Sequence, residues 1–187
     1  MKIIIVDNYD SFTYNLVHII EQHATEVVVK RIDEINISEL QKFDKIVFSP
    51  GPGLPSDTNI MNKILDSYKD FKSILGVCLG HQAIAEYLGG SLLNMNEVNH
   101  GREFETIIIK EDYIFKNIPK RFYSGRYHSW IVNDQNLPDE LEITSVDTKN
   151  QVMSIRHKIL DIRGVQFHPE SVMTKFGTKI LENWVNQ

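Results

Sequence analysis

The single cysteine of the chain stands in a pattern that predicts a nucleophile. The sequence reads Gly76-Val77-Cys78-Leu79-Gly80, directly after a short apolar run and before a segment of helical pattern. G-x-C-x-G at a strand-to-helix junction is the nucleophile-elbow pattern with sulfur in place of the serine oxygen. The sharp turn crowds the backbone, so both flanks must be small, and the helix N-terminus behind Cys78 favours a thiolate. The alternative is a buried cysteine in a glycine-rich turn.

A thiolate nucleophile needs a base and a group that orients the base, and His168-Pro169-Glu170 offers both. In an extended segment, residues i and i+2 point the same way, and Pro169 keeps the backbone extended. We therefore expect Glu170 to accept the Nδ1–H of His168 and to leave Nε2 facing sulfur. On its own the segment also fits a turn at a sheet edge with an incidental histidine, but with Cys78 it completes a Cys–His–Glu triad. No metal site is expected, because one cysteine and one H-x-E motif supply too few ligands.

The loop Ser49–Pro55 carries three prolines and follows another apolar run. Proline has no N–H group, so the donors that remain are the amides of Gly51, Gly53 and Leu54, held in a stiff loop. A rigid loop with few, fixed donors beside a nucleophile would form half of an oxyanion hole, with Gly53 as its donor. The N–H of Leu79 would form the other half. A simple rigid turn is the alternative.

These motifs follow apolar runs that predict a parallel sheet. The runs lack polar alternation, as strands buried on both faces do, and they comprise Ile3–Val6, Val27–Val29, Lys45–Phe48 and Ser73–Val77. Helical stripes lie between them: Phe12, Leu16, Ile19 and Ile20; a weaker one over Ser38–Phe43; and Ile60, Met61, Ile64, Leu65 and Tyr68. Strand–helix–strand order predicts an α/β fold of flavodoxin-like type, with an open, mostly parallel sheet flanked by helices. Ligands of such sheets bind beyond the carboxyl ends of the strands, where the motifs lie.

The second half of the chain predicts an antiparallel extension of the same domain. Shorter apolar runs are separated there by turn-rich segments, at Ser91–Leu93, Phe104–Lys110, Leu141–Val146, Val152–Arg156 and Ile162–Phe167. A final helix carries Phe176, Ile180 and Trp184 at helical spacing. Neither an internal repeat nor a linker interrupts the chain, so residues 1–187 are predicted to form a single domain.

Composition excludes several classes of protein. The chain has 187 residues, of which 42% are hydrophobic and 24% charged, as in ordinary globular proteins. Its net charge of −5 argues against a nucleic-acid binder, which needs a basic face. The apolar run in Met1–Asp7 is too short for a signal peptide or a membrane span, and no later run is longer. With one free cysteine, a reducing compartment is expected, and we predict a cytoplasmic protein without a membrane partner.

Five motifs in order resemble the class I, triad-type glutamine amidotransferase domain over nearly the whole chain. They are Asp7–Asn15, Ser49–Gly53, Gly76–Gln82, Arg126–Ser129 and Gln166–Ser171. The opening D-N-x-D-S-F-T-Y-N is similar to one branch, the small subunits of anthranilate synthase and aminodeoxychorismate synthase. Both supply ammonia to a chorismate-binding large subunit.

The resemblance implies a glutaminase that hydrolyses L-glutamine through a cysteine thioester, with Cys78 as nucleophile and His168 and Glu170 as base and orienting group. It implies a substrate pocket lined by Gly51, Pro52, Gly53, Gln82, Ser129 and Trp130. Gln82 fits independently, since it lies one helical turn past Cys78. No cofactor is expected in this chain, and Mg²⁺ is expected only in the partner subunit. Two departures from the family pattern are Trp130, where leucine is frequent, and the segment His100–Phe104, which leaves the details of the docking surface open.

Three hypotheses follow for the function. The first is a glutaminase subunit of a two-chain synthase, with the anthranilate partner preferred to the aminodeoxychorismate partner by a small margin, or one subunit serving both. Size supports it, because the chain has neither a phosphate-binding loop of G-x-x-x-x-G-K-S/T type nor a second domain for an ammonia acceptor. The second is a stand-alone thiol hydrolase of γ-glutamyl peptides, and the third a regulatory module without activity. The intact Cys78, His168 and Glu170 argue against the third.

Overall fold

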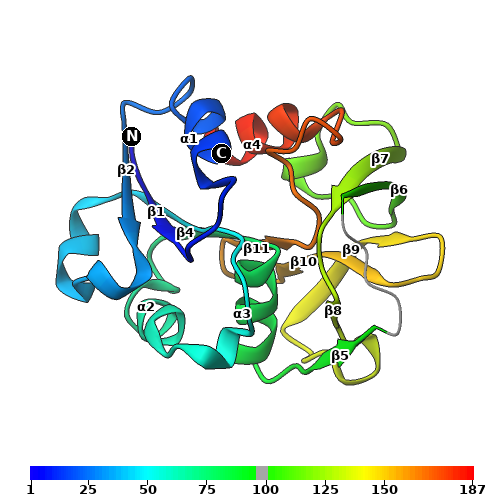
Figure 1. The fold of residues 1–187 in the computed structure, drawn as a ribbon, viewed down its shortest axis with the longest axis horizontal. Helices are drawn as coiled ribbons and strands as arrows, with labels where there is room; N and C mark the ends of the chain where they lie inside the picture. The colour runs from blue at the N-terminus through cyan, green and yellow to red at the C-terminus, as the bar shows by residue number, and fades with distance from the viewer. Residues whose placement is uncertain (96–100) are drawn as a thin grey trace.

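The structure is a computed structural model that describes residues 1–95 and 101–187. The strands of the described part are β1 (Lys2–Asp7), β2 (Glu26–Arg31), β3 (Lys45–Phe48), β4 (Ser73–Val77), β5 (Leu92–Asn94), β6 (Arg102–Ile108), β7 (Arg121–Arg126), β8 (Trp130–Val132), β9 (Leu141–Asp147), β10 (Val152–His157) and β11 (Ile162–Val165). Nine of these described strands form one sheet in the order β2-β1-β3-β4-β11-β10-β9-β6-β7, and β5 pairs with β8. This sheet runs through both halves of the chain (Figure 1).

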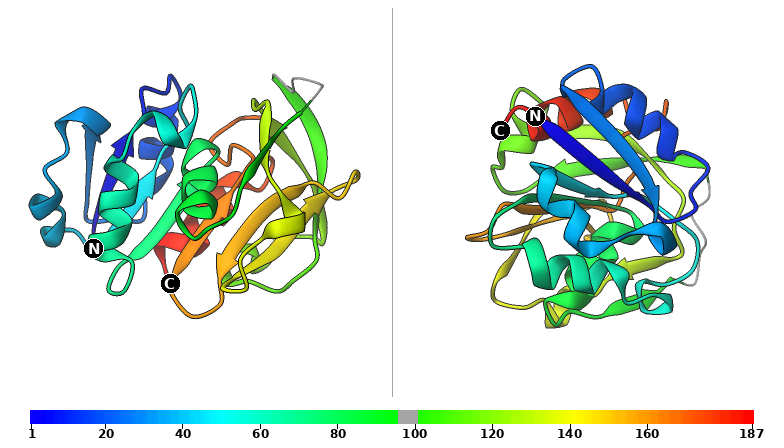
Figure 2. Two further views of the ribbon diagram at one scale, coloured as in Figure 1. Left: turned by 90° about the horizontal axis from the view of Figure 1, so that it is seen from below. Right: turned by 90° about the vertical axis from the view of Figure 1, so that its left-hand side faces the viewer.

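Helices cover both faces of the parallel part of the sheet. They are α1 (Thr13–Ile20), α2 (Ile60–Tyr68), α3 (Leu79–Tyr87) and α4 (Gly177–Val185). Helices α1 and α4 pack on one face and α2 and α3 on the other, as Figures 1 and 2 show. None of the helices in residues 1–95 and 101–187 is long and apolar enough to cross a membrane.

The apolar run in strand β1 contributes side chains to two hydrophobic cores, one on each face of the sheet. Successive side chains of a strand point to opposite faces of the sheet. Ile3 and Ile5 accordingly pack in the cluster beneath α1 and α4, whereas Ile4 and Val6 pack in the cluster beneath α2 and α3. All four are fully buried. A run without polar alternation is therefore the pattern that this position requires.

The parallel part has the flavodoxin-like order, with β11 as its fifth strand. β1 pairs with β2 and β3, β3 pairs with β4, and β4 pairs with β11, all in parallel. β2 lies on one side of β1 and β3 on the other, so the direction in which successive strands are added to the sheet reverses at β1. Such a switch point opens a crevice at the carboxyl ends of the strands. The loops after β1, β3, β4 and β11 lie at this edge, and they carry four of the five predicted motifs.

The predicted fold class is confirmed, with differences in detail. The antiparallel extension exists, but β11 belongs to the parallel part, where Gly164 pairs with Gly76. β7 and β8 were not predicted, because β7 contains two arginines and a glycine, and its strand form depends on pairing with β6. The expected helix over Ser38–Phe43 is a 3-10 helix at Ile37–Lys42. Phe12 precedes α1 and is 40% exposed, so it does not belong to the apolar face of that helix.

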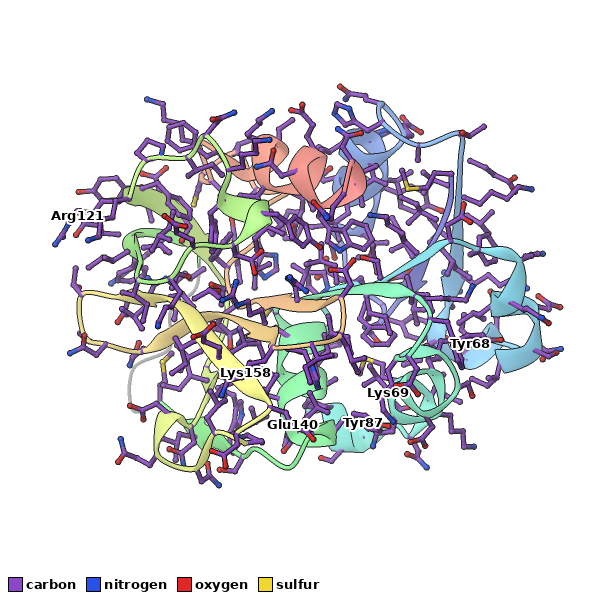
Figure 3. All side chains as sticks on the ribbon, turned by 180° about the vertical axis from the view of Figure 1, so that it is seen from behind. Tyr68, Lys69, Tyr87, Arg121, Glu140 and Lys158 are labelled. Atoms are coloured by element: carbon purple, nitrogen blue, oxygen red, sulfur yellow. The ribbon has the colours of Figure 1, made fainter. Side chains whose placement is uncertain are left out.

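Helices α2 and α3 are joined at their carboxyl ends by side-chain contacts. Lys69, which ends α2, donates to the hydroxyl of Tyr87 at 3.0 Å, and that hydroxyl donates to Asp66 at 2.7 Å. Lys69 and Tyr87 lie next to one another in Figure 3. These polar bonds lie at the protein surface, while the sides of both helices that face the sheet are apolar.

We expect Trp184 of α4 to be a main anchor of the second core. Its side chain is fully buried, and Lys45 donates to its carbonyl oxygen at 2.7 Å. Trp184→Ala should lower the free energy of unfolding by about 3–5 kcal/mol, because a large cavity remains. Phe71→Ala, at a residue 77% exposed, is the control and should change it by less than about 0.5 kcal/mol. Urea denaturation followed by circular dichroism measures both, and equal effects would contradict the assignment.

Candidate active site

Cys78 sits in a strained turn that glycines make possible. Its backbone has φ 52° and ψ −99°, a combination that a side-chain-bearing residue rarely adopts and that costs about 1–3 kcal/mol. Helix α3 begins at the next residue and lies directly on the strands: a Cβ at Gly80 would lie 2.5 Å from Phe48 Cβ, and one at Gly76 would lie 2.6 Å from His81 N. The predicted need for small residues on both flanks of the cysteine is thus confirmed by backbone contact.

His168 and Glu170 are joined as the sequence predicted, but the predicted extended backbone is wrong: residues 169–170 form a turn in which Ser171 N donates to His168 O at 3.2 Å. His168 Nδ1 and Glu170 Oε1 lie 2.6 Å apart, and both side chains are almost completely buried. The segment is held by its backbone, since His168 N donates to Gly125 O at 3.1 Å and Thr174 Oγ1 donates to His168 O at 2.6 Å. The bond to Glu170 fixes the ring so that Nε2 is the nitrogen left for another partner.

Burial and two neighbouring side chains, those of Cys78 and Glu170, together control the charge of His168. Burial lowers the pKa of this histidine, but attraction to the sulfur of Cys78 and the bond to Glu170 outweigh it and raise the pKa well above its usual range. Within the described residues, Nε2 makes no hydrogen bond, although His168 and Cys78 line the same cavity. Catalytic hydrogen bonds are often long or misaligned without substrate. The arrangement therefore favours a protonated imidazole at His168.

Two cavities meet at Cys78. One, of about 200 Å³, contains all the predicted pocket residues together with Leu79: its lining includes Gly51, Pro52, Gly53, Cys78, Leu79, Gln82, Ser129 and Trp130. The other, of about 400 Å³, is lined by the loop after β1, including Tyr9, Asp10 and Phe12, and by His168. Cys78 lines both, so its sulfur can be reached from two sides.

The predicted oxyanion donors lie at the smaller cavity. Gly53 has φ 79°, a left-handed conformation that favours glycine, and its loop is braced by the bond from Leu54 N to Asp57 Oδ2 at 2.8 Å. Leu79 N belongs to the first turn of α3, where amide groups have no partner inside the helix. Both residues line the smaller cavity with Cys78. The role of their amides as an oxyanion hole stays a prediction.

Gln82 and the Ser129–Trp130 pair meet across the smaller cavity. Gln82 Nε2 donates to Trp130 O at 2.9 Å, so the tryptophan contributes its backbone and its side-chain type matters less there. The carbonyl of Ser129 accepts from Met95 N at 2.8 Å, which attaches this wall to the segment after β5. In the atypical segment His100–Phe104, Arg102–Phe104 belong to β6, and His100 lies outside the described residues.

Sequence reasoning missed three residues at this site. The Tyr127 ring packs edge-on against the His168 ring with centroids 4.8 Å apart, and Tyr127 lines both cavities. Asp10 lies near the His168–Glu170 pair, and burial is the main reason that its pKa is raised. Gln166 donates to Cys78 Sγ at 3.6 Å. All three lie inside motifs that the resemblance had singled out, but their positions at the site depend on tertiary contacts.

Buried charge supports the pocket wall from behind. Arg126, at the end of β7, donates to Asp147 at 2.7 Å, and both side chains are nearly inaccessible. His128 Nδ1 contacts Trp130 O at 3.0 Å. Burial, and then the charge of Arg126, lower the pKa of His128 to about 4, and burial lowers that of His81 to about 3. Both histidines are therefore neutral at neutral pH.

No group of three or more His, Cys, Asp or Glu residues that could hold a metal ion occurs within residues 1–95 and 101–187. The expectation that this chain carries no cofactor stays a prediction.

A family model described as glutamine amidotransferase class-I matches residues 4–187. The chain belongs to this family. The amidotransferase is 43% identical over 186 residues to anthranilate synthase component 2 of Pyropia yezoensis, which covers 98% of each chain. It is 41% identical over 187 residues to aminodeoxychorismate/anthranilate synthase component 2 of Bacillus subtilis (strain 168), covering 98% of this chain and 95% of the relative.

Solved structures agree on the fold of the amidotransferase. A Thermoplasma acidophilum chain superposes with a TM-score of 0.90 at 26% identity and covers all of this chain and 92% of its own. A glutamine amidotransferase from Thermotoga maritima has a TM-score of 0.76 at 15% identity, covering 91% of this chain and 76% of its own. The second likeness concerns the fold alone.

The neutral histidines make the amidotransferase sensitive to acid. A histidine whose folded pKa is depressed contributes stability above its unfolded pKa, near 6.5, and loses it as pH falls toward the folded value. His128→Asn keeps a donor for Trp130 O without this titration. Between pH 7 and pH 4.5, the variant should lose about 2 kcal/mol less unfolding free energy than the unaltered protein loses. The pKa of His168 is raised instead, but His168 is present in both the variant and the unaltered protein, so its contribution cancels in the comparison.

Urea denaturation at several pH values tests this, with His18→Asn as the matched control, since His18 is exposed on α1. The control should lose stability with acid just as the unaltered protein does. If His128→Asn did the same, the buried, neutral state of His128 would be wrong.

Proposed function

We propose that this chain is the glutaminase subunit of a chorismate-utilising synthase. It would release ammonia from L-glutamine and deliver it to a chorismate-binding large subunit. The observation that carries the proposal is the position of Cys78, between a cavity lined by Gln82 and one lined by His168. Anthranilate synthase is our first choice of complex, supported by the name of the Pyropia relative. Aminodeoxychorismate synthase is the second, supported by the double name of the Bacillus subtilis relative.

The chemistry follows from the geometry in two steps. The Cys78 thiolate attacks the side-chain carbonyl carbon of glutamine, and the amides of Leu79 and Gly53 stabilise the negative oxygen that forms. His168 gives its Nε2 proton to the amide nitrogen, so the C–N bond breaks, ammonia leaves, and a glutamyl thioester remains. Water then attacks the thioester while His168 accepts a proton, which yields glutamate and restores the thiolate. Glu170 keeps the imidazole oriented throughout and stabilises its charge.

The face that carries Cys78 is suited to a protein partner. Two aromatic side chains that line the larger cavity, Tyr9 and Phe12, are exposed. Exposed apolar patches of this kind mark interaction surfaces in soluble proteins. His168 lines the same cavity, so ammonia that it protonates would depart on this side. A partner on this face would receive it without loss to water.

We expect Cys78→Ser to abolish glutamine-dependent synthesis by the complex. The loss should be roughly a thousandfold or more, because a serine hydroxyl beside His168 is a far weaker nucleophile than a thiolate. Synthesis from added ammonium salt by the same complex is the internal control and should continue at the unaltered rate. Near-normal use of glutamine by the variant complex would show that the nucleophile lies elsewhere.

We expect the isolated chain to hydrolyse glutamine slowly and the partner with chorismate to accelerate it. Coupling between two sites is typically ~1–3 kcal/mol, which corresponds to roughly 5–150-fold in affinity, and its effect on the rate need not be symmetric. The measurement is ammonia release by the chain alone, with the large subunit, and with the large subunit plus chorismate. A high rate for the chain alone, unchanged by either addition, would favour a stand-alone γ-glutamyl hydrolase.

A further inference from the structure

A series of hydrogen bonds leads from Trp130 in the pocket wall to Cys78, and the donor and the acceptor of each bond are fixed. It starts at the carbonyl oxygen of Trp130, which can only accept. Gln82 Nε2 lies 2.9 Å from this oxygen, so the side-chain nitrogen of Gln82, and not its oxygen, must face Trp130. His128 Nδ1 lies 3.0 Å from the same oxygen and acts as a second donor. The orientation of the Gln82 amide is therefore determined by a backbone group.

The same nitrogen determines the orientation of the next amide. Gln82 Nε2 lies 3.1 Å from Gln166 Oε1, and its second hydrogen is directed there. A reversed Gln166 would place two NH₂ groups against each other, so its oxygen must face Gln82 and its nitrogen must face Cys78. Gln166 Nε2 lies 3.6 Å from Cys78 Sγ, and Gln166 is completely inaccessible to solvent. The sulfur is thus offered a donor that has no alternative orientation.

We propose that Gln166 is a positioning residue that holds Cys78 Sγ as a hydrogen-bond acceptor, with its direction imposed by the Trp130 carbonyl through Gln82. The proposal rests on the proposed function, since it concerns the thiolate that attacks glutamine. An N–H donor stabilises a thiolate more than a thiol, because bonds to ionised acceptors are the stronger ones.

The same series of hydrogen bonds also connects Cys78 to the smaller cavity. Both N–H groups of Gln82 are used, by Trp130 O and by Gln166 Oε1, so only its oxygen remains for a ligand in the smaller cavity. A ligand that pulls on Gln82 would alter the bond to Gln166 and, through it, the position of the sulfur. Gln166 belongs to the loop after β11. Its backbone N donates to Met153 O of β10 at 2.8 Å, which fixes the backbone of Gln166.

The test is the pH dependence of alkylation of the single cysteine by iodoacetamide in the purified chain. Gln166→Met keeps the length of the side chain and removes the donor. It should raise the pH midpoint of alkylation by about one unit, so that the rate well below both midpoints falls about tenfold. Val165→Ala is the matched control. It changes the buried last residue of β11, directly before Gln166, leaves the hydrogen bonds of Gln82 and Gln166 intact, and should leave the midpoint unchanged.

Gln82→Met provides a second test of the proposal, which can still be made if Gln166→Met fails to fold. It should also raise the midpoint in an otherwise unaltered chain, and it should have no further effect when Gln166 is already methionine. An unchanged midpoint in either folded single variant would overturn the proposal. Alkylation does not require glutamine turnover, so these results are independent of the ammonia-release assay. Loss of ammonia release with normal midpoints would contradict the positioning role and leave the proposed function standing.

Discussion

The active site depends on how closely α3 approaches the sheet beneath it. Gly76 and Gly80 have no side chains, so the first turn of the helix rests directly on β4 and on Phe48 of β3. In the turn that leads into this helix, Cys78 adopts a backbone conformation with positive φ. Leu79 and Gln82 follow at the start of α3, and both line the smaller cavity with Cys78. A side chain at either glycine would displace the helix and every group that it positions.

Around this turn, the protein stabilises groups that are unfavourable to bury. The His168–Glu170 pair is almost inaccessible, and so is the Arg126–Asp147 pair behind the pocket wall. Removing one partner of a buried ion pair leaves an uncompensated charge and typically costs about 3–5 kcal/mol. His81 and His128 avoid that penalty by remaining neutral. The site combines one charged histidine with two neutral ones, and burial and neighbouring charge determine which is which.

The sequence predicted the parts of the site that depend on local backbone geometry. The elbow at Cys78 and the contact between His168 and Glu170 follow from short segments rich in glycine or proline, whose conformational effects are local, although Pro169 and Glu170 form a turn and not the predicted extended segment. β7 was missed, because its form depends on pairing with β6 rather than on its own pattern. The contacts of Gln166 and Tyr127 join loops that are distant in sequence and could not be predicted from spacing. The neutral states of His81 and His128 also required the structure, since burial produces them.

The central claim is that Cys78 attacks glutamine in the cavity lined by Gln82. Its most direct test is a glutamine analogue that carries an electrophilic carbon in place of the carboxamide, added to the complex with the large subunit. The account predicts one label per chain on the peptide that contains Cys78, loss of glutamine-dependent activity in step with labelling, and protection by L-glutamine. Loss of that activity with the label on another residue, or labelling of Cys78 that glutamine does not slow, would contradict it.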